Sequence, residues 1–215
     1  MKIALINGSP RVKYSSSGIL LNSIKPKLQD NNIIEEFYFR TSEINSDYLE
    51  QISGCDVILF AFPLYVDGIP SHLLRCLYLM EKYFGSNINN DIIVYAIVNA
   101  GFYEGKQAGL AIEMMKNWAE KAKLKWGQGI GIGGGGMMSM IENSTATKGR
   151  MKDVHIALTH LAKNIIVCKS ADEIYTTPGI PRIAYIIGGN MGWRQSAKKN
   201  GLKAKDLSRV SGKVW

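Results

Sequence analysis

The sequence predicts a three-layer α/β fold in which helices cover both faces of a five-stranded parallel sheet. Short apolar segments alternate with segments of helical periodicity from residue 2 to residue 167, a pattern typical of parallel sheets with crossover helices. The run 56–61 is almost entirely apolar, as expected for a central strand buried on both faces. Hydrophobic residues make up 46% of the chain and charged residues 20%, which is close to the averages for folded globular proteins.

The first half of the chain opens with a strand, a loop and a helix. A polar turn containing Gly8 and Pro10 ends the first apolar strand, and an apolar-periodic stretch starts at Ser17. A second strand and a short helix precede the buried central strand. The expected elements are strand 2–7, helix 17–28, strand 33–39, helix 46–52 and strand 56–61.

The second half continues the alternation. Leu73, Leu77, Met80 and Phe84 recur at helical spacing, which indicates a third crossover helix. The expected elements are helix 69–84, strand 92–98, helix 106–122, strand 126–132 and helix 148–167. Five strands connected in this way favour the sheet order 2-1-3-4-5.

We expect the chain to divide into a domain of residues 1–170 and an extension of residues 171–215 that packs on it. The extension contains Pro178, Pro181 and several glycines, and it is strongly basic. A basic segment can attract nucleic acid, an acidic protein or an anionic membrane surface, but a charged run is more often a solvated face. We therefore do not expect nucleic acid as a partner. The charged residues from 182 onward are Asp206 and the basic residues Arg182, Arg194, Lys198, Lys199, Lys203, Lys205, Arg209 and Lys213.

Neither a membrane span nor a metal site is expected. The longest apolar run, 57–66, is too short to cross a bilayer and contains a proline. The N-terminus lacks the features of a signal peptide, which favours a cytoplasmic protein. Cys55, Cys76 and Cys168 are far apart and form no C-x-x-C pair, so we expect three buried reduced thiols. The three histidines form no ligand set.

The loop after the first strand is a candidate phosphate site. In sheets of this kind, ligands bind outside the carboxyl ends of the strands, near the topological switch point. Loop 7–18 carries Ser9, Ser16 and Ser17 directly before a helix. Unpaired backbone N–H groups and the positive end of the helix dipole, together with these hydroxyls, suit a phosphate dianion. The alternative is that Ser17 only caps the helix and the other serines are solvated.

The loops after the third and fourth strands are also unusual. Loop 62–70 carries large apolar side chains, including Leu64 and Tyr65, which suggests a wall for a flat apolar ligand. Alternatively, these side chains simply cover the core. Loop 99–105 combines glycines, which allow close approach of the backbone, with Phe102. Together the three loops fit a ligand with a phosphate at one end and a broad ring at the other.

These motifs resemble the flavodoxin-like NADPH-dependent FMN reductases and their NAD(P)H-quinone reductase and iron-sulfur flavoprotein relatives. The resemblance covers roughly residues 1–167 and implies a flavodoxin-like domain that binds FMN. Two features depart from the family pattern: Ser15-Ser16-Ser17 stands where the family often has Gly-Asn-Thr, one residue later in the loop, and the cysteine motif of the iron-sulfur flavoproteins is absent. The matching segments are Gly8-Ser9-Pro10-Arg11 followed by Ser16-Ser17, Pro63-x-Tyr65 followed by Ile69-Pro70, and the loop after the fourth strand.

The resemblance also implies roles for individual residues. In the family the first segment holds the FMN phosphate, and the second and third hold the isoalloxazine ring. Backbone N–H groups near Val66 and Gly101 are candidates for hydrogen bonds to the ring edge. We expect no catalytic side chain, because the flavin carries the chemistry. The implied cofactor-binding residues are Ser9, Arg11, Ser15, Ser16 and Ser17 for the phosphate, and Pro63, Leu64, Tyr65, Val66, Asn99, Gly101 and Phe102 for the ring.

A glycine-rich segment follows the fifth strand. Gly129-x-Gly131-x-x-Gly134 formally matches a dinucleotide-binding fingerprint. It lies along and after a strand, and no helix starts promptly behind it. We interpret these glycines instead as positions where the chain passes close to the flavin or to a neighbouring subunit.

We expect an oxidoreductase that transfers a hydride from NADPH or NADH to FMN and then to a small-molecule acceptor: a quinone, azo compound, nitro compound or flavin. One alternative is a non-enzymatic electron carrier, although such flavodoxins are usually acidic and this chain has a net charge of +8. Another is a phosphoacceptor domain, but its acidic positions hold Asn7-Gly8 and Ala61-Phe62 here. Because relatives complete the acceptor pocket with a second subunit, we expect a homodimer.

Overall fold

The computed structural model describes residues 1–86, 91–138 and 149–208. Residues 1–179 form one compact unit, which contains a six-stranded sheet in the order β2-β1-β3-β4-β5-β6. Every neighbouring pair of strands is parallel. The strands are β1 (Lys2–Asn7), β2 (Ile33–Tyr38), β3 (Val57–Pro63), β4 (Ile93–Asn99), β5 (Lys125–Ile132) and β6 (Ile174–Thr176).

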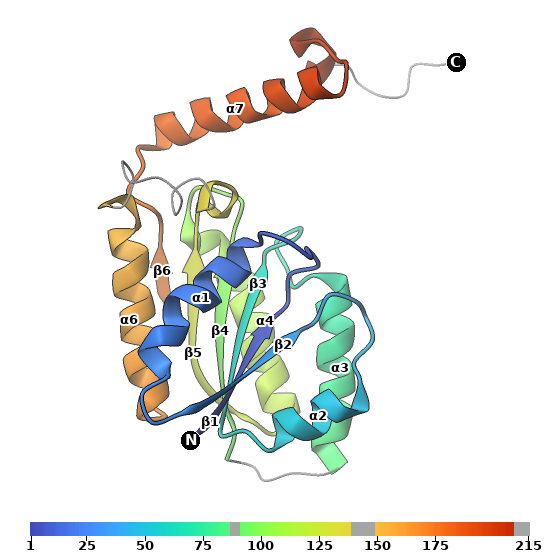
Figure 1. The fold of residues 1–215 in the computed structure, drawn as a ribbon, viewed down its shortest axis with the longest axis vertical. Helices are drawn as coiled ribbons and strands as arrows, with labels where there is room; N and C mark the ends of the chain where they lie inside the picture. Colours follow the sequence, from blue (N-terminus) through green and yellow to red (C-terminus); the bar gives the residue numbers. More distant parts are fainter. Residues whose placement is uncertain (87–90, 139–148, 209–215) are drawn as a thin grey trace. The chain divides into compact units, whose positions relative to one another are not determined.

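Helices cover both faces of this sheet, as predicted. On one face lie α1 and α6, and on the other lie α2, α3 and α4 (Figure 1). Because strand side chains alternate in direction, Phe60 of β3 packs against Trp118 of α4. Tyr95 of β4 instead donates its hydroxyl to the Asn164 carbonyl of α6 at 3.2 Å. The helices are α1 (Ser16–Leu28), α2 (Ser46–Ser53), α3 (Ser71–Ser86), α4 (Gly109–Lys121) and α6 (Lys152–Ile166), with short 3-10 helices η1 (Gly105–Ala108) and η2 (Gly135–Met137).

The prediction of five strands is wrong, because β6 adds a sixth at the edge of the sheet. Its three residues pair in parallel with Ile130, Gly131 and Ile132 of β5. A strand of three partly exposed residues is too short to produce a recognisable apolar pattern. The other predicted strands and helices are present. Lys148, the first residue of predicted helix 148–167, lies outside the described residues.

Residues 180–215 form a second compact unit. Its described part contains helix α7 (Arg182–Lys199) and the short helix η4 (Ala204–Ser208). The Leu202 N–H donates to the Ala197 carbonyl at 2.9 Å, which turns the chain back at the end of α7. The basic residues Arg209 and Lys213 lie outside the described residues.

Two of the three predicted buried thiols are confirmed. Cys55 and Cys76 are buried, and burial raises the pKa of both thiols to about 11, so they stay protonated and unreactive at neutral pH. Cys168 is exposed, contrary to the prediction, because it follows the end of α6 with a positive φ of 51°. In the described ranges, no helix combines the length and apolar character that crossing a membrane requires.

Candidate functional site

The loop after β1 is folded back on itself by Asn7, the last residue of that strand. The Asn7 side-chain carbonyl accepts a hydrogen bond from the Ser9 backbone N–H at 3.0 Å, and the Asn7 amide donates to Ser15 Oγ at 3.4 Å. The Gly8 N–H donates to the Ala61 carbonyl of β3 at 2.9 Å. These bonds place the start and the end of the loop beside the carboxyl end of β3.

Helix α1 begins at the end of this loop. Ser15 has an extended backbone, and its Oγ accepts a hydrogen bond from Gly18 N–H at 3.0 Å, so Ser15 is the N-cap. The alternative in which Ser17 caps the helix is therefore wrong. Ser17 donates its hydroxyl to Asn99 Oδ1 at 2.8 Å, which joins the start of α1 to the end of β4.

The loop after β3 has a strained tip. Tyr65 and Gly68 exchange two backbone hydrogen bonds of 3.1 Å, and the two residues between them, Val66 and Asp67, have φ values of 48° and 58°. A β-branched residue rarely adopts this conformation, and such residues cluster at functional sites. The Val66 side chain is fully exposed, so the protein interior does not hold it in place.

The glycine segment after β5 packs against the loop after β4 and the start of α1. The Gly135 N–H donates to the Ala100 carbonyl at 2.7 Å, and the Gly134 N–H donates to the Phe102 carbonyl at 2.6 Å. Ser16 Oγ donates to the Gly135 carbonyl at 2.7 Å. A Cβ at Gly135 would lie 2.9 Å from the Ala100 carbonyl oxygen, so a glycine is required for this close approach.

The loops enclose a cavity of about 190 Å³ at the carboxyl end of the sheet. Every predicted site residue except Val66 and Phe102 lines it; those two are exposed. Tyr14, Gly135 and Gly136 also line the cavity but were not predicted as site residues. The glycine run after the fifth strand is the sequence feature that points to Gly135 and Gly136. Nothing in the sequence distinguishes Tyr14 as a lining residue. The lining residues are Ser9, Arg11, Tyr14, Ser15, Ser16, Ser17, Pro63, Leu64, Tyr65, Asn99, Gly101, Gly135 and Gly136.

The polar side chains that the fold buries are concentrated around this cavity. Within the described ranges they are Asn7, Ser9, Ser15, Ser17, Asn99 and Gln128, and all but Gln128 belong to its loops. Arg11 adds a positive charge, and no Asp or Glu from the described part of the chain lines the cavity. Hydroxyls, a guanidinium and the N-terminus of α1 form a donor set that suits an anion.

Two glycines leave space inside the cavity. A Cβ added at Gly101 or at Gly136 would meet no atom within 4 Å, although both residues line the cavity. Since neither has a positive φ, their backbone conformations do not require glycine. The absence of side chains at these two positions therefore keeps the cavity open.

The glycines of the formal dinucleotide fingerprint are packing positions. Gly129 and Gly131 lie within β5, and a Cβ at Gly129 would lie 2.5 Å from the Ile112 side chain of α4. In the described residues, β5 continues from Gly131 to Ile132, and the three-residue 3-10 helix η2 starts only at Gly135, after the last glycine of the fingerprint; the fingerprint instead requires its glycines to open a helix directly after a strand. The close approach at Gly129 and Gly131 is thus to other parts of the same chain, and their predicted approach to the flavin or to a neighbouring subunit stays a prediction.

A phosphoacceptor centre does not form at the corresponding strand ends. Asn7 and Ala61 are neighbours across β1 and β3, and neither carries a carboxylate. Within the ranges that the structure describes, no group of three or more His, Cys, Asp or Glu side chains is placed to hold a metal ion.

No family model and no curated protein matches the sequence. Solved structures with similar folds include NAD(P)H:quinone oxidoreductase from Methanothermobacter marburgensis, with a TM-score of 0.58 and 16% identity over 77% of this chain and 96% of that one. The Trp repressor binding protein from Bacillus subtilis has a TM-score of 0.54 and 16% identity, over 74% of this chain and 96% of that one. A flavodoxin from Streptococcus pneumonia TIGR4 has a TM-score of 0.53 and 11% identity, over 78% of this chain and 99% of that one.

The chain has a flavodoxin-like fold. This agrees with the resemblance of its motifs, and the six-stranded sheet is a variation at one edge. In the flavodoxin-like fold the strand order reverses between β1 and β3, and ligands bind at such switch points. The cavity lies at this position, since its walls follow β1, β3, β4 and β5.

Proposed function

We propose that the chain binds FMN in this cavity and acts as an NAD(P)H-dependent oxidoreductase. The observation that carries the proposal is the gathering of buried polar side chains with Arg11 around a cavity without acidic residues. The quinone oxidoreductase and flavodoxin among the structural neighbours support it at the level of fold. FMN carries a phosphate ester, which suits the polar end of the site, and a flat ring, which suits its apolar end.

The residues divide between the two ends of the proposed ligand. Arg11 and the hydroxyl of Ser9 bind the phosphate beside the N-terminus of α1. The Ser16 hydroxyl donates to the Gly135 carbonyl and would have to exchange this bond for one to the phosphate. Leu64 and Tyr65 provide an apolar face for the ring, and Gly101 lets it approach the backbone. Val66 and Phe102 are exposed at the rim, where they contact the outer edge of the ring or the acceptor.

Bound FMN would supply the hydride chemistry, accepting from NADPH or NADH and donating to a quinone, azo, nitro or flavin acceptor. The chain orients the ring and excludes water from its buried side. A cavity of about 190 Å³ is smaller than sites that enclose a whole ligand of this size, so one side of the ring stays open to the acceptor. We propose that a second subunit covers that side in a homodimer.

The first test is FMN binding by Arg11→Ala and by its matched control Lys13→Ala. Both changes remove one positive charge from the same loop, but only Arg11 lines the cavity. Loss of a charge-assisted hydrogen bond to the phosphate should weaken FMN binding by about tenfold or more in Arg11→Ala. The Kd is measured from the quenching of flavin fluorescence. Equal Kd values for the two variants would contradict the phosphate position, and wild-type protein that takes up no FMN would overturn the proposal.

The second test separates an enzyme from an electron carrier. FMN-loaded protein is mixed with NADPH or NADH and with menadione or an azo dye, and oxidation of the nicotinamide is followed by absorbance. We expect turnover. A protein that retains FMN but leaves NADPH and NADH unoxidised would be an electron carrier, the function that the flavodoxin neighbour suggests.

A further inference from the structure

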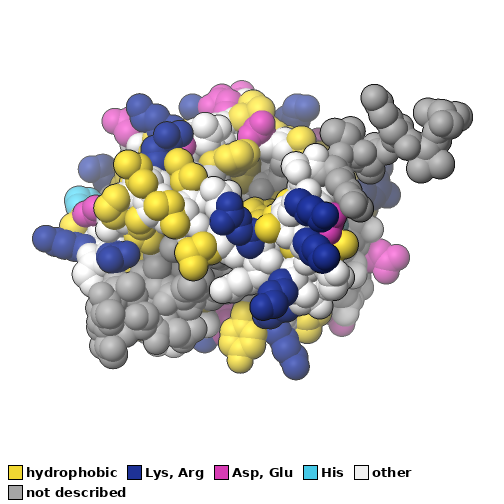
Figure 2. Space-filling model, turned by 90° about the horizontal axis from the view of Figure 1, so that it is seen from above, with side chains coloured by type: hydrophobic (Ala, Val, Ile, Leu, Met, Phe, Trp, Pro, Cys, Tyr) yellow, Lys and Arg dark blue, Asp and Glu magenta, His cyan; other side chains and the backbone are white. Residues whose placement is uncertain are grey.

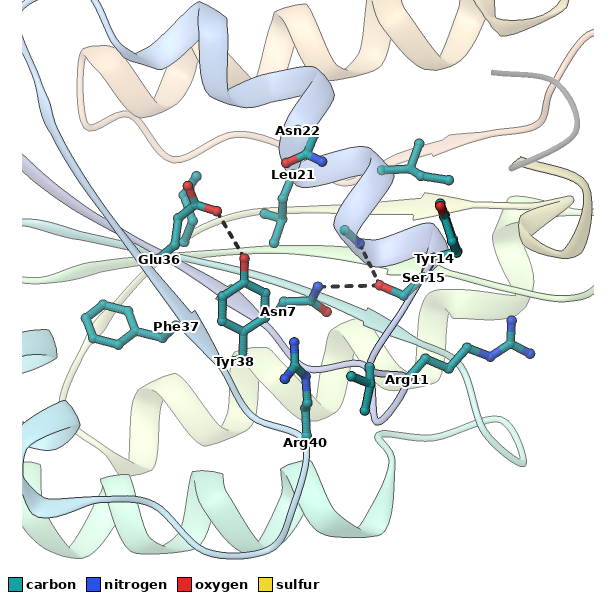
Figure 3. Close-up of a pocket in the computed structure, with 14 residues that line it drawn as sticks. Asn7, Arg11, Tyr14, Ser15, Leu21, Asn22, Glu36, Phe37, Tyr38 and Arg40 are labelled. Atoms are coloured by element: carbon teal, nitrogen blue, oxygen red, sulfur yellow. Dashed lines mark hydrogen bonds between the residues drawn. The ribbon is translucent and has the colours of Figure 1, made fainter. Parts of the chain in front are cut away.

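A second and larger cavity, which we call the β2 cavity, lies beside the carboxyl end of β2. Its volume is about 380 Å³, and it lies between α1, the loop after β1 and residues 36–40. Leu5, Leu21 and Phe37 line it and are buried. Figure 3 shows that its polar side chains come from the loop after β1, from α1 and from the end of β2. None of the roles proposed above for FMN uses this end of β2.

The β2 cavity has a guanidinium over a phenol ring at the end of β2. The Arg40 guanidinium lies 4.8 Å from the centre of the Tyr38 ring. Arg11 and Tyr14, from the loop after β1, add a second guanidinium and a second phenol ring to the lining at separate positions (Figure 3). Guanidinium groups bind phosphate through paired hydrogen bonds, and they stack on aromatic rings. The combination therefore suits a ligand that carries both phosphate and an aromatic ring.

The acidic residue that lines the β2 cavity is already paired. Glu36 forms an ion pair with Lys25, and the Tyr38 hydroxyl donates a hydrogen bond to Glu36 Oε2 at 3.4 Å. The positive charges of Arg11 and Arg40 are therefore not cancelled by this carboxylate. The cavity favours an anion.

The β2 cavity adjoins the proposed flavin site. Arg11, Tyr14 and Ser15 line both cavities. Tyr14 has a positive φ of 50° and a largely exposed ring, so this ring is accessible at the boundary between them. A long ligand can therefore occupy the β2 cavity with one end and extend toward the flavin site with the other.

We propose that the β2 cavity binds the adenosine end of NADPH and that Arg40 contacts its 2′-phosphate. The identity of the ligand as a co-substrate rests on the function proposed above. In other doubly wound sheets that bind dinucleotides, an Arg near the corresponding strand end accommodates this 2′-phosphate. Arg40 follows β2 directly after Phe39. NADPH is then preferred over NADH, which lacks that phosphate.

The test measures binding of 2′-phosphoadenosine, adenosine and inorganic phosphate to the full-length, FMN-treated protein by calorimetry. We expect 2′-phosphoadenosine to bind at least about tenfold more tightly than adenosine or phosphate alone, since one charge-assisted contact accounts for such a factor. Arg40→Ala should remove this advantage. The matched control is Arg75→Ala, because Arg75 also stacks on a tyrosine, Tyr78, at 5.1 Å, but lies on α3 and does not line the cavity.

The possible outcomes separate this proposal from the function on which it rests. If 2′-phosphoadenosine binds no more tightly than inorganic phosphate, the site takes a free anion and the proposal is overturned. It is also overturned if Arg40→Ala and Arg75→Ala bind 2′-phosphoadenosine equally well. If the wild type binds 2′-phosphoadenosine through Arg40 but takes up no FMN, the nucleotide site stands and the flavin proposal fails.

Discussion

At the scale of single residues, the candidate site depends on glycines, which leave space in the cavity, as well as on the polar side chains that line it. The hydroxyls of loop 7–18 can be recognised in the sequence because serines before a helix have a known use. The glycine run after β5 marks a segment of close approach, but the run alone does not show that Gly136 is the residue that leaves space in the cavity, since the neighbouring glycines look the same in the sequence. Only the structure shows that Gly101 and Gly136 face open space within a cavity.

Gly101→Leu should fill the proposed flavin site without unfolding the protein. A Cβ at this position meets no atom within 4 Å, so the side chain starts in open space in the cavity, where the ligand would collide with it. Such overfilling costs about 1–3 kcal/mol, so FMN should bind roughly tenfold to a hundredfold more weakly. Flavin fluorescence titration gives the Kd, and thermal melting reports the stability.

Gly85→Leu is the control for this change. A Cβ at Gly85 also meets nothing within 4 Å, and the residue lies in α3 outside the cavity. We expect its affinity for FMN to match that of the wild type. If Gly101→Leu also binds FMN as the wild type does, the ring does not lie against this loop.

At the scale of elements, the strength of the sequence signal decides what could be predicted. Strand β3 and residues 3–6 of β1 are continuous apolar runs, as expected for parallel strands buried on both faces. Strand β6 has three residues, and its attachment depends on polar side chains before it. Glu173 accepts hydrogen bonds from Trp126 Nε1 at 3.0 Å and from the Gly129 N–H. A contact between residues 44 apart leaves no local pattern.

The attachment of β6 should make stability depend on pH. Burial raises the pKa of the Glu173 carboxyl above its ordinary value of 4.5. The folded state therefore binds a proton more tightly than the unfolded state, and the free energy of unfolding falls as the pH rises from the ordinary carboxyl pKa through the raised one. Glu173→Gln should abolish this decrease. At low pH it should cost about 1 kcal/mol, because an amide oxygen replaces a carboxyl with two acceptors.

The measurement is urea denaturation over a series of pH values. Glu120→Gln serves as the control, because Glu120 is exposed on α4. The difference in the free energy of unfolding between wild type and Glu173→Gln should change with pH. The same difference between wild type and Glu120→Gln should stay constant. Parallel pH profiles for wild type and Glu173→Gln would show that the Glu173 carboxyl is not responsible.

At the scale of the whole molecule, the proposed sites and the basic charge belong to different parts of the chain. Both cavities are lined by residues 1–179, whereas much of the net charge of +8 comes from residues after 181. On the face that Figure 2 shows, Lys and Arg side chains lie among hydrophobic ones. In α7, Ile183, Met191 and Trp193 are exposed. The sequence placed the boundary between domain and extension at residue 170, but β6 and its anchor Glu173 follow that position.

Two truncations test where the flavin-binding unit ends. A chain that stops after Gly179 keeps β6 and every residue that lines the two cavities, so its Kd for FMN should equal that of the full chain. A chain that stops after Ser170 loses β6 and Glu173, exposes the edge of β5 and leaves the Trp126 indole N–H without its acceptor. It should be less stable by several kcal/mol, since buried hydrogen bonds and strand pairing are lost together. Flavin titration and thermal melting compare the two. Loss of FMN binding in the chain that ends after Gly179 would place part of the flavin site in residues 180–215. Equal stability of the two shortened chains would support a domain boundary at residue 170.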